Sequence, residues 1–316
     1  MPVPMAPELQ AKLLNPPVGD WVTLRDGHVV YARTWPVPDG TDLIATLTWV
    51  HGLGEHINRY DHVFTDMAAA GIYVHAWDQR GFGRTALRNK SQGQIKAWSQ
   101  VLDDVAEALH RNTVPGKPKF LGGHSLGGLV VLDFLRTRGK DAGLAGVIAT
   151  SPAIEAPPES RAPTFAIPIL RLLAFVLPNV TTTAKLDATV LTHDEAIMKE
   201  YLADPLVSGT LSFRFTNAMI RGMIHLSKPE TPRTLPAEVP LLLTHGTEDK
   251  LTYAPGTVTF YERAKHLVDR EVKVFEGQRH ELHHEPAVRD EVVRTWIDWM
   301  QKRVNGPVRQ SVETMA

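Results

Sequence analysis

Strand-like and helix-like stretches alternate along the first half of this 316-residue chain and again near its end. Short apolar runs such as LIATLTWVHG (43–52) are typical of buried strands, and segments such as IKAWSQVLDDVAEALHRN (95–112) carry apolar residues at helical spacing. Repeated strand–helix units pack as a mostly parallel sheet with helices on both faces. We therefore expect an α/β fold, preceded by a hairpin that turns at Asp26-Gly27.

The alternation stops between residues 152 and 236. This segment is punctuated by prolines and is helical in pattern, with no clear buried strand. Because a structureless loop of that length is improbable in a compact domain, we interpret it as a helical cap inserted into the sheet domain. The predicted organisation is a core at 1–151, a cap at 152–236, the rest of the core at 237–305, and a tail at 306–316.

Charged residues are nearly balanced, with 34 Lys and Arg against 35 Asp and Glu. A net charge of −1 does not point to nucleic acid or to a strongly anionic surface, so no nucleic-acid partner is expected. The absence of cysteine excludes disulfides, thiolate-bound metals and a cysteine nucleophile, and it fits a reducing compartment. Since the first residues, MPVPMAPELQ, lack the basic and apolar regions of a secretory signal, we expect a cytoplasmic location.

The pentapeptide GHSLG at 123–127 fits the pattern G-x-S-x-G and stands between an apolar strand pattern and a helical one. In that context small residues allow an abrupt strand-to-helix turn, the nucleophile elbow, which strains the serine backbone and lifts its hydroxyl above the sheet. The N-terminus of the following helix favours negative charge that develops nearby. A glycine-rich turn can also be purely structural, so a reactive Ser125 requires suitable partner residues later in the chain.

A reactive serine requires a base and a carboxylate that orients this base. On an elbow they follow in the order acid, then histidine, each in a loop after a later strand. The strand pattern VPLLLTHG (239–246) is followed by two carboxylates, Glu248 and Asp249. The last strand pattern is followed by three histidines: His280, His283 and His284. We select His280 because it lies just past the strand, whereas the other two run into a helix expected to open at Glu285-Pro286.

Acyl transfer also requires hydrogen-bond donors for a developing oxyanion. An early strand pattern ends in HGLG (51–54), whose glycines allow the backbone N–H of Leu53 to point inward. The second donor is the N–H of Leu126, the residue after the candidate nucleophile. An ordinary glycine-rich turn would explain the glycines, but not their place at the edge of the sheet where the serine is expected.

Seven segments in fixed order resemble the monoacylglycerol lipases of the α/β-hydrolase superfamily, and especially their fungal members, over about residues 21–304. These are HGLGEHINRY, DQRGFGRT, GHSLGG, SPAIEAPPES, YLADPLV, HGTEDKLT and FEGQRHELHHE. The resemblance implies an α/β-hydrolase fold with an inserted helical cap, and cleavage of monoacylglycerol to glycerol and fatty acid. It implies no metal or organic cofactor. Mammalian members carry cysteines near the site, and this chain has none.

The resemblance also assigns residues. It places Ser125, Asp249 and His280 in the catalytic triad, with Leu53 and Leu126 supplying the oxyanion amides. Residues that match Glu55, Arg59 and His283 line the family's polar glycerol end, and Tyr201 matches a tyrosine near the mouth of the cap. The alternative for Glu55 and Arg59 is a plain surface ion pair.

Three other functions are open. A broader carboxylesterase, lysophospholipase or fatty-acid ethyl ester hydrolase would share this fold, and a lipid-binding protein could keep the pocket without activity. The segment His280-Glu281-Leu282-His283-His284 satisfies H-E-x-x-H, a zinc-protease signature that needs a continuous helix. Because Pro286 disfavours helix at Glu285, we consider zinc the weakest of the three.

The most apolar segment, TFAIPILRLLAFVL (164–177), falls in the expected cap. It is shorter than the roughly 20 residues that span a bilayer. Read as a helix, it carries a wide apolar side formed by Phe165, Ile169, Leu172, Leu173 and Val176. We expect part of this side to be exposed and to bring the protein into peripheral contact with a membrane or lipid droplet. The sequence leaves the oligomeric state open.

Overall fold

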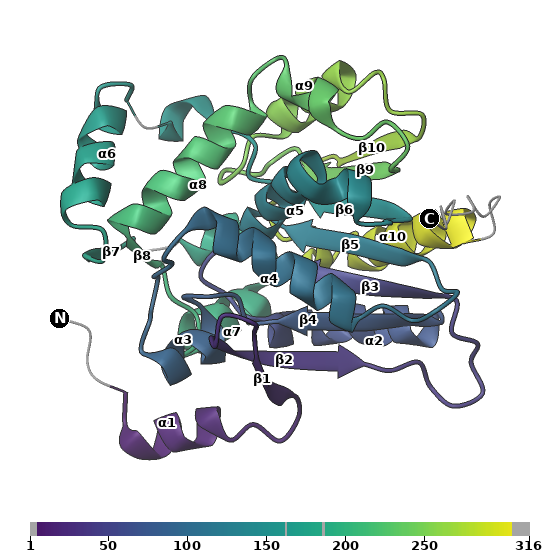
Figure 1. Ribbon diagram of the computed structural model, residues 1–316, viewed down its shortest axis with the longest axis horizontal. Coiled ribbons are helices and arrows are strands. Elements are labelled where there is room, and N and C mark those ends of the chain that lie inside the picture. Colours follow the sequence, from purple (N-terminus) through teal and green to yellow (C-terminus); the bar gives the residue numbers. More distant parts are fainter. Residues whose placement is uncertain (1–4, 162, 185–186, 305–316) are drawn as a thin grey trace, which may run out of the picture.

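The computed structural model describes residues 5–161, 163–184 and 187–304, and eight of its strands form one sheet (Figure 1). The strand order is β1-β2-β4-β3-β5-β6-β9-β10. All pairs from β4 to β10 are parallel, and the pairs β1-β2 and β2-β4 are antiparallel. The strands are β1 (Asp20–Thr23), β2 (Val29–Trp35), β3 (Ala45–Val50), β4 (Ile72–Trp77), β5 (Lys119–His124), β6 (Gly146–Thr150), β9 (Leu241–Gly246) and β10 (Arg270–Phe275).

Helices cover both faces of this sheet. One face packs against α4 (Trp98–Arg111), α5 (Leu126–Arg138) and α9 (Ala254–Arg263), and the other against α2 (Asp61–Ala69) and α10 (Arg289–Val304). Figure 1 shows α4 and α5 on the near side of the strands, with α2 and α10 behind them. Every residue of β3, β6 and β9 is buried, and this explains why these strands are mostly apolar, with threonines as the main exceptions. The predicted α/β fold is confirmed.

Between β6 and β9 the chain forms the helices α6 (Ala166–Val176), α7 (Glu195–Ala203) and α8 (Phe213–Leu226). In Figure 1, α6 and α8 lie together beyond one end of the sheet. This segment also holds a small antiparallel pair that was not predicted, β7 (Thr181–Thr183) with β8 (Thr210–Ser212). Each strand has three residues and β7 is fully exposed, so the sequence contains no buried apolar run from which this pair could be predicted. The division at 152 and 236 stays a prediction.

Some element boundaries differ from the expected ones. The last helix opens at Arg289 rather than at Glu285-Pro286, and the preceding residues form a short 3-10 turn at Leu282–His284. Two helices, α1 (Pro7–Leu14) and α3 (Gly83–Asn89), were not predicted. None of the helices in the described ranges has the length and apolar character needed to cross a membrane. The predicted tail at 306–316 lies outside those ranges.

Candidate active site

Ser125 lies at the sharp turn between β5 and α5. Its backbone takes φ 56° and ψ −115°, a strained conformation for a residue with a side chain. The turn requires glycine at two flanking positions. A side chain at Gly127 would overlap the carbonyl oxygen of Val50, and one at Gly123 would overlap the carbonyl of Gly127. The predicted elbow geometry is therefore present, and it holds Ser125 at the carboxyl edge of the parallel sheet.

Asp249 and His280 come together from the loops after β9 and β10. Because these strands are parallel neighbours, both loops leave the sheet at the edge where Ser125 lies. The ring nitrogen Nδ1 of His280 is 2.7 Å from Oδ2 of Asp249, and both side chains are buried. The other candidate carboxylate, Glu248, has a side chain that is 55% exposed. The structure thus brings His280 onto Asp249 and leaves Glu248 at the surface.

Four further donors surround the Asp249 carboxylate. Oδ1 accepts the backbone N–H groups of Leu251 and Thr252 at 2.8 and 2.9 Å. Oδ2 accepts the Thr252 hydroxyl at 2.7 Å and lies 3.0 Å from Nε2 of His245. Burial raises the pKa of Asp249, but the His280 and His245 rings outweigh burial and hold that pKa well below its usual range. The carboxylate therefore stays ionised. Sequence reasoning missed His245 and Thr252, although both flank the acid in HGTEDKLT.

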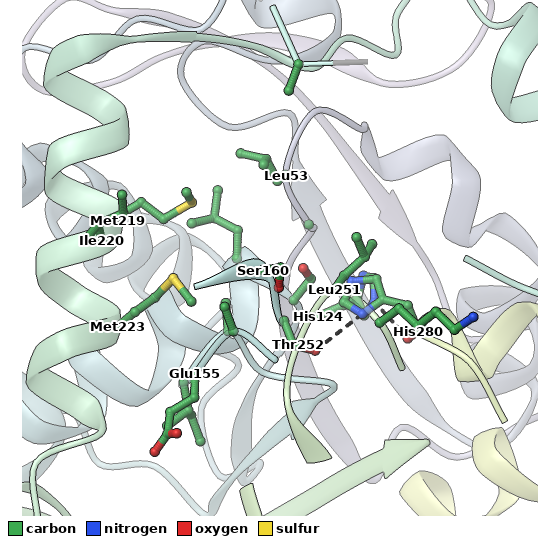
Figure 2. Close-up of a pocket in the computed structure, with 18 of the residues that line it drawn as sticks. Leu53, His124, Glu155, Ser160, Met219, Ile220, Met223, Leu251, Thr252 and His280 are labelled. Atoms are coloured by element: carbon green, nitrogen blue, oxygen red, sulfur yellow. Dashed lines mark hydrogen bonds between the residues drawn. The ribbon is translucent and has the colours of Figure 1, made fainter. Parts of the chain in front are cut away.

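Ser125 and His280 line one cavity of about 780 Å³, and Figure 2 shows a close-up of this cavity. Within the described residues no hydrogen bond joins the Ser125 hydroxyl to the His280 ring, a loose arrangement common in unliganded hydrolases. Leu53 and Leu126 also line the cavity, and in the described chain neither backbone N–H has a protein acceptor. A Cβ atom at Gly52 would lie 3.3 Å from Cβ of Ser125, so the turn with Leu53 adjoins the elbow.

The cavity has an apolar part and a polar part. Met219 and Met223 extend into it from α8, with Ile220 on the same helix (Figure 2). The polar part contains four side chains near one another, namely Glu55, Arg59, Tyr201 and Glu281. Such a cavity suits an amphipathic ligand that has a long apolar portion and a small polar end.

The polar part is organised around Arg59. Its guanidinium lies 2.6 Å from Glu55 and makes two contacts of 2.7 Å with Glu281. The Arg59 side chain is 9% exposed and the two carboxylates are 3% exposed or less, so this is a buried network and not a surface ion pair. Tyr201 lies under the guanidinium, which is 4.8 Å from the ring centre. Glu281 was not predicted as part of the site.

The Arg59 network keeps its carboxylates ionised. Burial raises the pKa of Glu281, but Arg59 and His284 more than offset it, so the pKa lies well below its usual range. Burial also raises the pKa of Glu55, but Arg59 and His124 outweigh burial and lower that pKa. Glu55 also accepts hydrogen bonds from the N–H of Gly52 and the hydroxyl of Tyr60.

His283 does not reach the cavity, and this corrects its predicted contact with the substrate. The ring is fully buried behind the wall and stacks on Tyr60, with ring centres 4.6 Å apart. It is held there because the 3-10 turn after Glu281 directs it under the elbow, where its neighbours are His124 and Trp296. Among the described residues neither of its ring nitrogens has a hydrogen-bond partner.

The H-E-x-x-H segment does not form a zinc site in this fold. Its outer histidines face different partners, since His280 contacts Asp249 and His284 contacts Glu281 at 2.7 Å. Because the segment is a turn and not a helix, the two rings do not share a face. Across 5–161, 163–184 and 187–304, no group of three or more His, Cys, Asp or Glu side chains is placed to hold a metal ion.

Comparison with known proteins agrees with this geometry. The family described as serine aminopeptidase, S33, matches residues 41–287. Monoglyceride lipase of Mus musculus is 31% identical over 286 residues, which cover 88% of this chain and 89% of that protein. The chain belongs to the monoglyceride lipase family of α/β-hydrolases. The resemblance inferred from the seven sequence segments is thereby confirmed.

Two further proteins are similar to this member of the monoglyceride lipase family. The crystal structure of a soluble variant of monoglyceride lipase from Saccharomyces cerevisiae, in complex with a substrate analogue, superimposes with a TM-score of 0.81 at 25% identity. The superposition covers 92% of this chain and 97% of the Saccharomyces cerevisiae chain. An uncharacterised abhydrolase domain-containing protein of Dictyostelium discoideum is 32% identical over 90% of this chain, which spans only 29% of that longer protein.

Proposed function

We propose that the protein is a serine hydrolase that cleaves monoacylglycerols to glycerol and a free fatty acid through an acyl-enzyme. The observation that carries the proposal is the buried contact between His280 Nδ1 and Asp249 Oδ2, made on the wall of the cavity that holds Ser125. A histidine oriented by an ionised carboxylate next to a strained serine is the arrangement of a catalytic triad. The names of the relatives support the substrate class.

In the proposed mechanism, rotation of the Ser125 side chain brings its hydroxyl to Nε2 of His280. This ring removes the proton as Ser125 attacks the ester carbonyl. The backbone N–H groups of Leu53 and Leu126 donate to the oxyanion, each worth roughly 3 kcal/mol in favourable cases. His280 then protonates the departing glycerol, and water activated by the same ring releases the fatty acid. Asp249 stabilises the imidazolium that forms.

The substrate assignment follows from the two parts of the cavity. An acyl chain fits against the apolar side chains that α8 contributes to the cavity, namely Met219, Ile220, Met223 and Ile224. A glycerol leaving group carries two free hydroxyls, which require fixed polar partners when they are buried. Carboxylate oxygens accept several hydrogen bonds each, so Glu55, held by Arg59, is assigned as acceptor for these hydroxyls. Tyr201 packs against the guanidinium at this end of the cavity.

The test of the mechanism uses purified wild type with Ser125→Ala, His280→Ala and the double variant. Each single variant is expected to lose several orders of magnitude in kcat, and the double variant to be hardly worse, because the two groups act as one unit. A fluorophosphonate should label wild type and not Ser125→Ala. Activity that vanishes on chelation and returns with zinc would replace the serine mechanism by a metal-dependent one.

The test of the substrate class compares monoacylglycerol, diacylglycerol, triacylglycerol, lysophospholipid, a fatty-acid ethyl ester and an aryl ester of the same acyl chain. Glu55→Gln should lower turnover of monoacylglycerol more than turnover of the aryl ester, since only the former leaves with free hydroxyls. Equal losses on both esters would show that Glu55 supports the fold and does not select the leaving group.

We also propose that the cap brings the protein to a lipid surface. The helix α6 has no buried residue, and its large apolar side chains are among the most exposed in the described chain, with Phe175 at 83% and Leu172 at 62%. Phe165 and Val176 extend the same apolar surface. An exposed apolar patch of this kind marks an interaction site. Since Arg171 is the only charged residue of the helix, attachment is expected to depend little on salt.

A further inference from the structure

Ser151 follows β6 at the same edge of the sheet at which Ser125 follows β5. The two strands are parallel neighbours, and the last pair between them is His124 with Thr150. Ser125 and Ser151 each follow that pair by one residue, so the two serines stand in equivalent positions. The N–H of Ser125 donates to the carbonyl of Thr150 at 3.0 Å, which joins the two turns directly.

Ser151 has a strained backbone. Its φ is 41°, in the left-handed region that favours glycine. Only three non-glycine residues of the described chain have positive φ, and the other two are Ser125 and Lys90. Lys90 is exposed at the end of α3, a place where such a conformation is common. Among the described residues, strain of this kind at a buried position is therefore confined to the proposed nucleophile Ser125 and to Ser151.

The Ser151 side chain makes one hydrogen bond. The residue has no exposed surface, and its hydroxyl donates to the backbone carbonyl of His280 at 2.8 Å. Its own N–H donates to the carbonyl of Thr244 at 2.7 Å, and its carbonyl lies 3.1 Å from the hydroxyl oxygen of Thr252. That hydroxyl also contacts Asp249. Ser151 thus connects the peptide group of His280 to the residues that surround the acid.

A glycine would adopt this backbone without strain but would leave the His280 carbonyl without its hydroxyl donor. The carbonyl needs an anchor because His280 lies in a loop, outside the hydrogen-bond ladder of the sheet. Its other neighbour is Nε2 of His124, at the longer distance of 3.3 Å. The same peptide group is held on its other side, where the N–H of Glu281 donates to the carbonyl of Leu191 at 2.7 Å, so Ser151 supplies one of two direct anchors for the peptide that carries the His280 carbonyl.

We infer that Ser151 is a positioning residue, whose buried hydroxyl holds the backbone of His280 so that Nε2 of the ring faces Ser125. The inference rests on the proposed serine mechanism. It assigns Ser151 no contact with the substrate.

The experiment compares Ser151→Ala and Ser151→Gly with wild type. Both variants lose the hydroxyl, but only glycine also relieves the strained backbone, so their melting temperatures should diverge, with the glycine variant the more stable. A positioning role predicts the same fall of about 10- to 100-fold in kcat for both, with KM for monoacylglycerol unchanged. Labelling of Ser125 by a fluorophosphonate should slow to a similar degree and still reach full stoichiometry. Lys90→Gly, which relieves strain far from the cavity, should keep wild-type kcat.

The inference would be overturned if the loss of kcat followed the melting temperature, with a large loss in Ser151→Ala and none in Ser151→Gly. It would also be overturned if both variants kept the kcat of wild type. If the alanine variant does not fold, the glycine variant alone decides between these results. Wild type that resists labelling would overturn the serine mechanism and the inference together, whereas labelled wild type with fully active Ser151 variants overturns only the inference.

Discussion

Asp249 and His280 meet across two neighbouring loops, with a carboxylate oxygen 2.7 Å from the ring nitrogen; the Asp249 side chain is fully buried, and the His280 side chain is 4% exposed, toward the cavity. Because two backbone amides and a hydroxyl hold the carboxylate from the other sides, its orientation does not depend on the histidine. The acid is thus fixed before the base carries any charge. A preorganised carboxylate of this kind stabilises the imidazolium without further rearrangement.

Replacing Asp249 by Asn should lower kcat by about 10⁴-fold, because the amide can no longer select the productive tautomer of His280. KM should change little. Steady-state kinetics on monoacylglycerol measure both constants, and near-ultraviolet circular dichroism checks that the fold is retained. The matched control is Glu248→Gln, which alters the neighbouring exposed carboxylate and should leave kcat as in wild type. A comparable loss of kcat in Glu248→Gln would indicate that Glu248, and not Asp249, is the carboxylate that orients His280.

Replacing Arg59 by Met should lower the free energy of unfolding by about 3–5 kcal/mol, since it leaves Glu55 and Glu281 buried without their shared cation. Urea unfolding at neutral pH measures the difference. The control is Arg161→Met, which removes an ion pair with Glu155 and a hydrogen bond to the Ala156 carbonyl; because the Arg161 side chain is 48% exposed, the loss of the ion pair should cost less than about 1 kcal/mol. Similar small losses in both variants would mean that water reaches the Arg59 network.

His75 should make the protein less stable in mild acid. Burial lowers its pKa to about 4, with Arg111 adding to the effect, whereas an unfolded histidine titrates near 6.5. The stability that its neutral form contributes is complete above pH 6.5 and is lost as the pH falls toward 4, by up to about 3 kcal/mol. Urea unfolding of wild type and His75→Gln at pH 7.5 and 4.5 measures this loss, which should shrink in the variant. The exposed His110→Gln should behave as wild type, and an unchanged loss in His75→Gln would contradict the assignment.

Serine in place of both Leu172 and Phe175 should weaken attachment to neutral liposomes at least tenfold, because each buried side chain of this size is worth roughly 1.5–3 kcal/mol. Liposome flotation measures the attachment at low and high salt, and the difference should persist at both. Turnover of long-chain monoacylglycerol should fall, while a water-soluble short ester is spared. Val268 and Val274 are exposed on the sheet domain, so replacing both with serine provides the control. A double variant of α6 that floats like wild type would exclude α6 as the contact.

The parts of the site that the sequence predicted are those set by local chemistry. The elbow could be read from GHSLG because the glycines are required by contacts within the turn and with the adjacent strand. His280 could be chosen over its neighbours because a loop position follows directly from where the strand ends. The width of the apolar side of α6 likewise indicated exposure, since one packed face cannot cover so broad an arc.

The features that the sequence did not reveal depend on distant pairing. Arg59 and Glu281 are 222 residues apart, and no periodic pattern connects them. His283 was assigned by resemblance to the cavity wall, but the turn that places it behind Tyr60 depends on the loop after β10. The role of His245 was hidden because a histidine at the end of a buried strand resembles ordinary core packing, and only the fold shows that it faces Asp249.

The three helices α6, α7 and α8 leave the sheet after β6, and the chain returns at β9, the strand directly beside it. Val147 pairs with Leu241 as though nothing intervened. Because loop closure costs only about 0.6 kcal/mol for each doubling of length, an excursion at this point can grow, shrink or be exchanged with little penalty to the sheet. Recombination between genes could therefore replace this whole segment in one step. The resulting protein would keep Ser125, Asp249 and His280 beneath a different cap, and we expect such a protein to accept different esters.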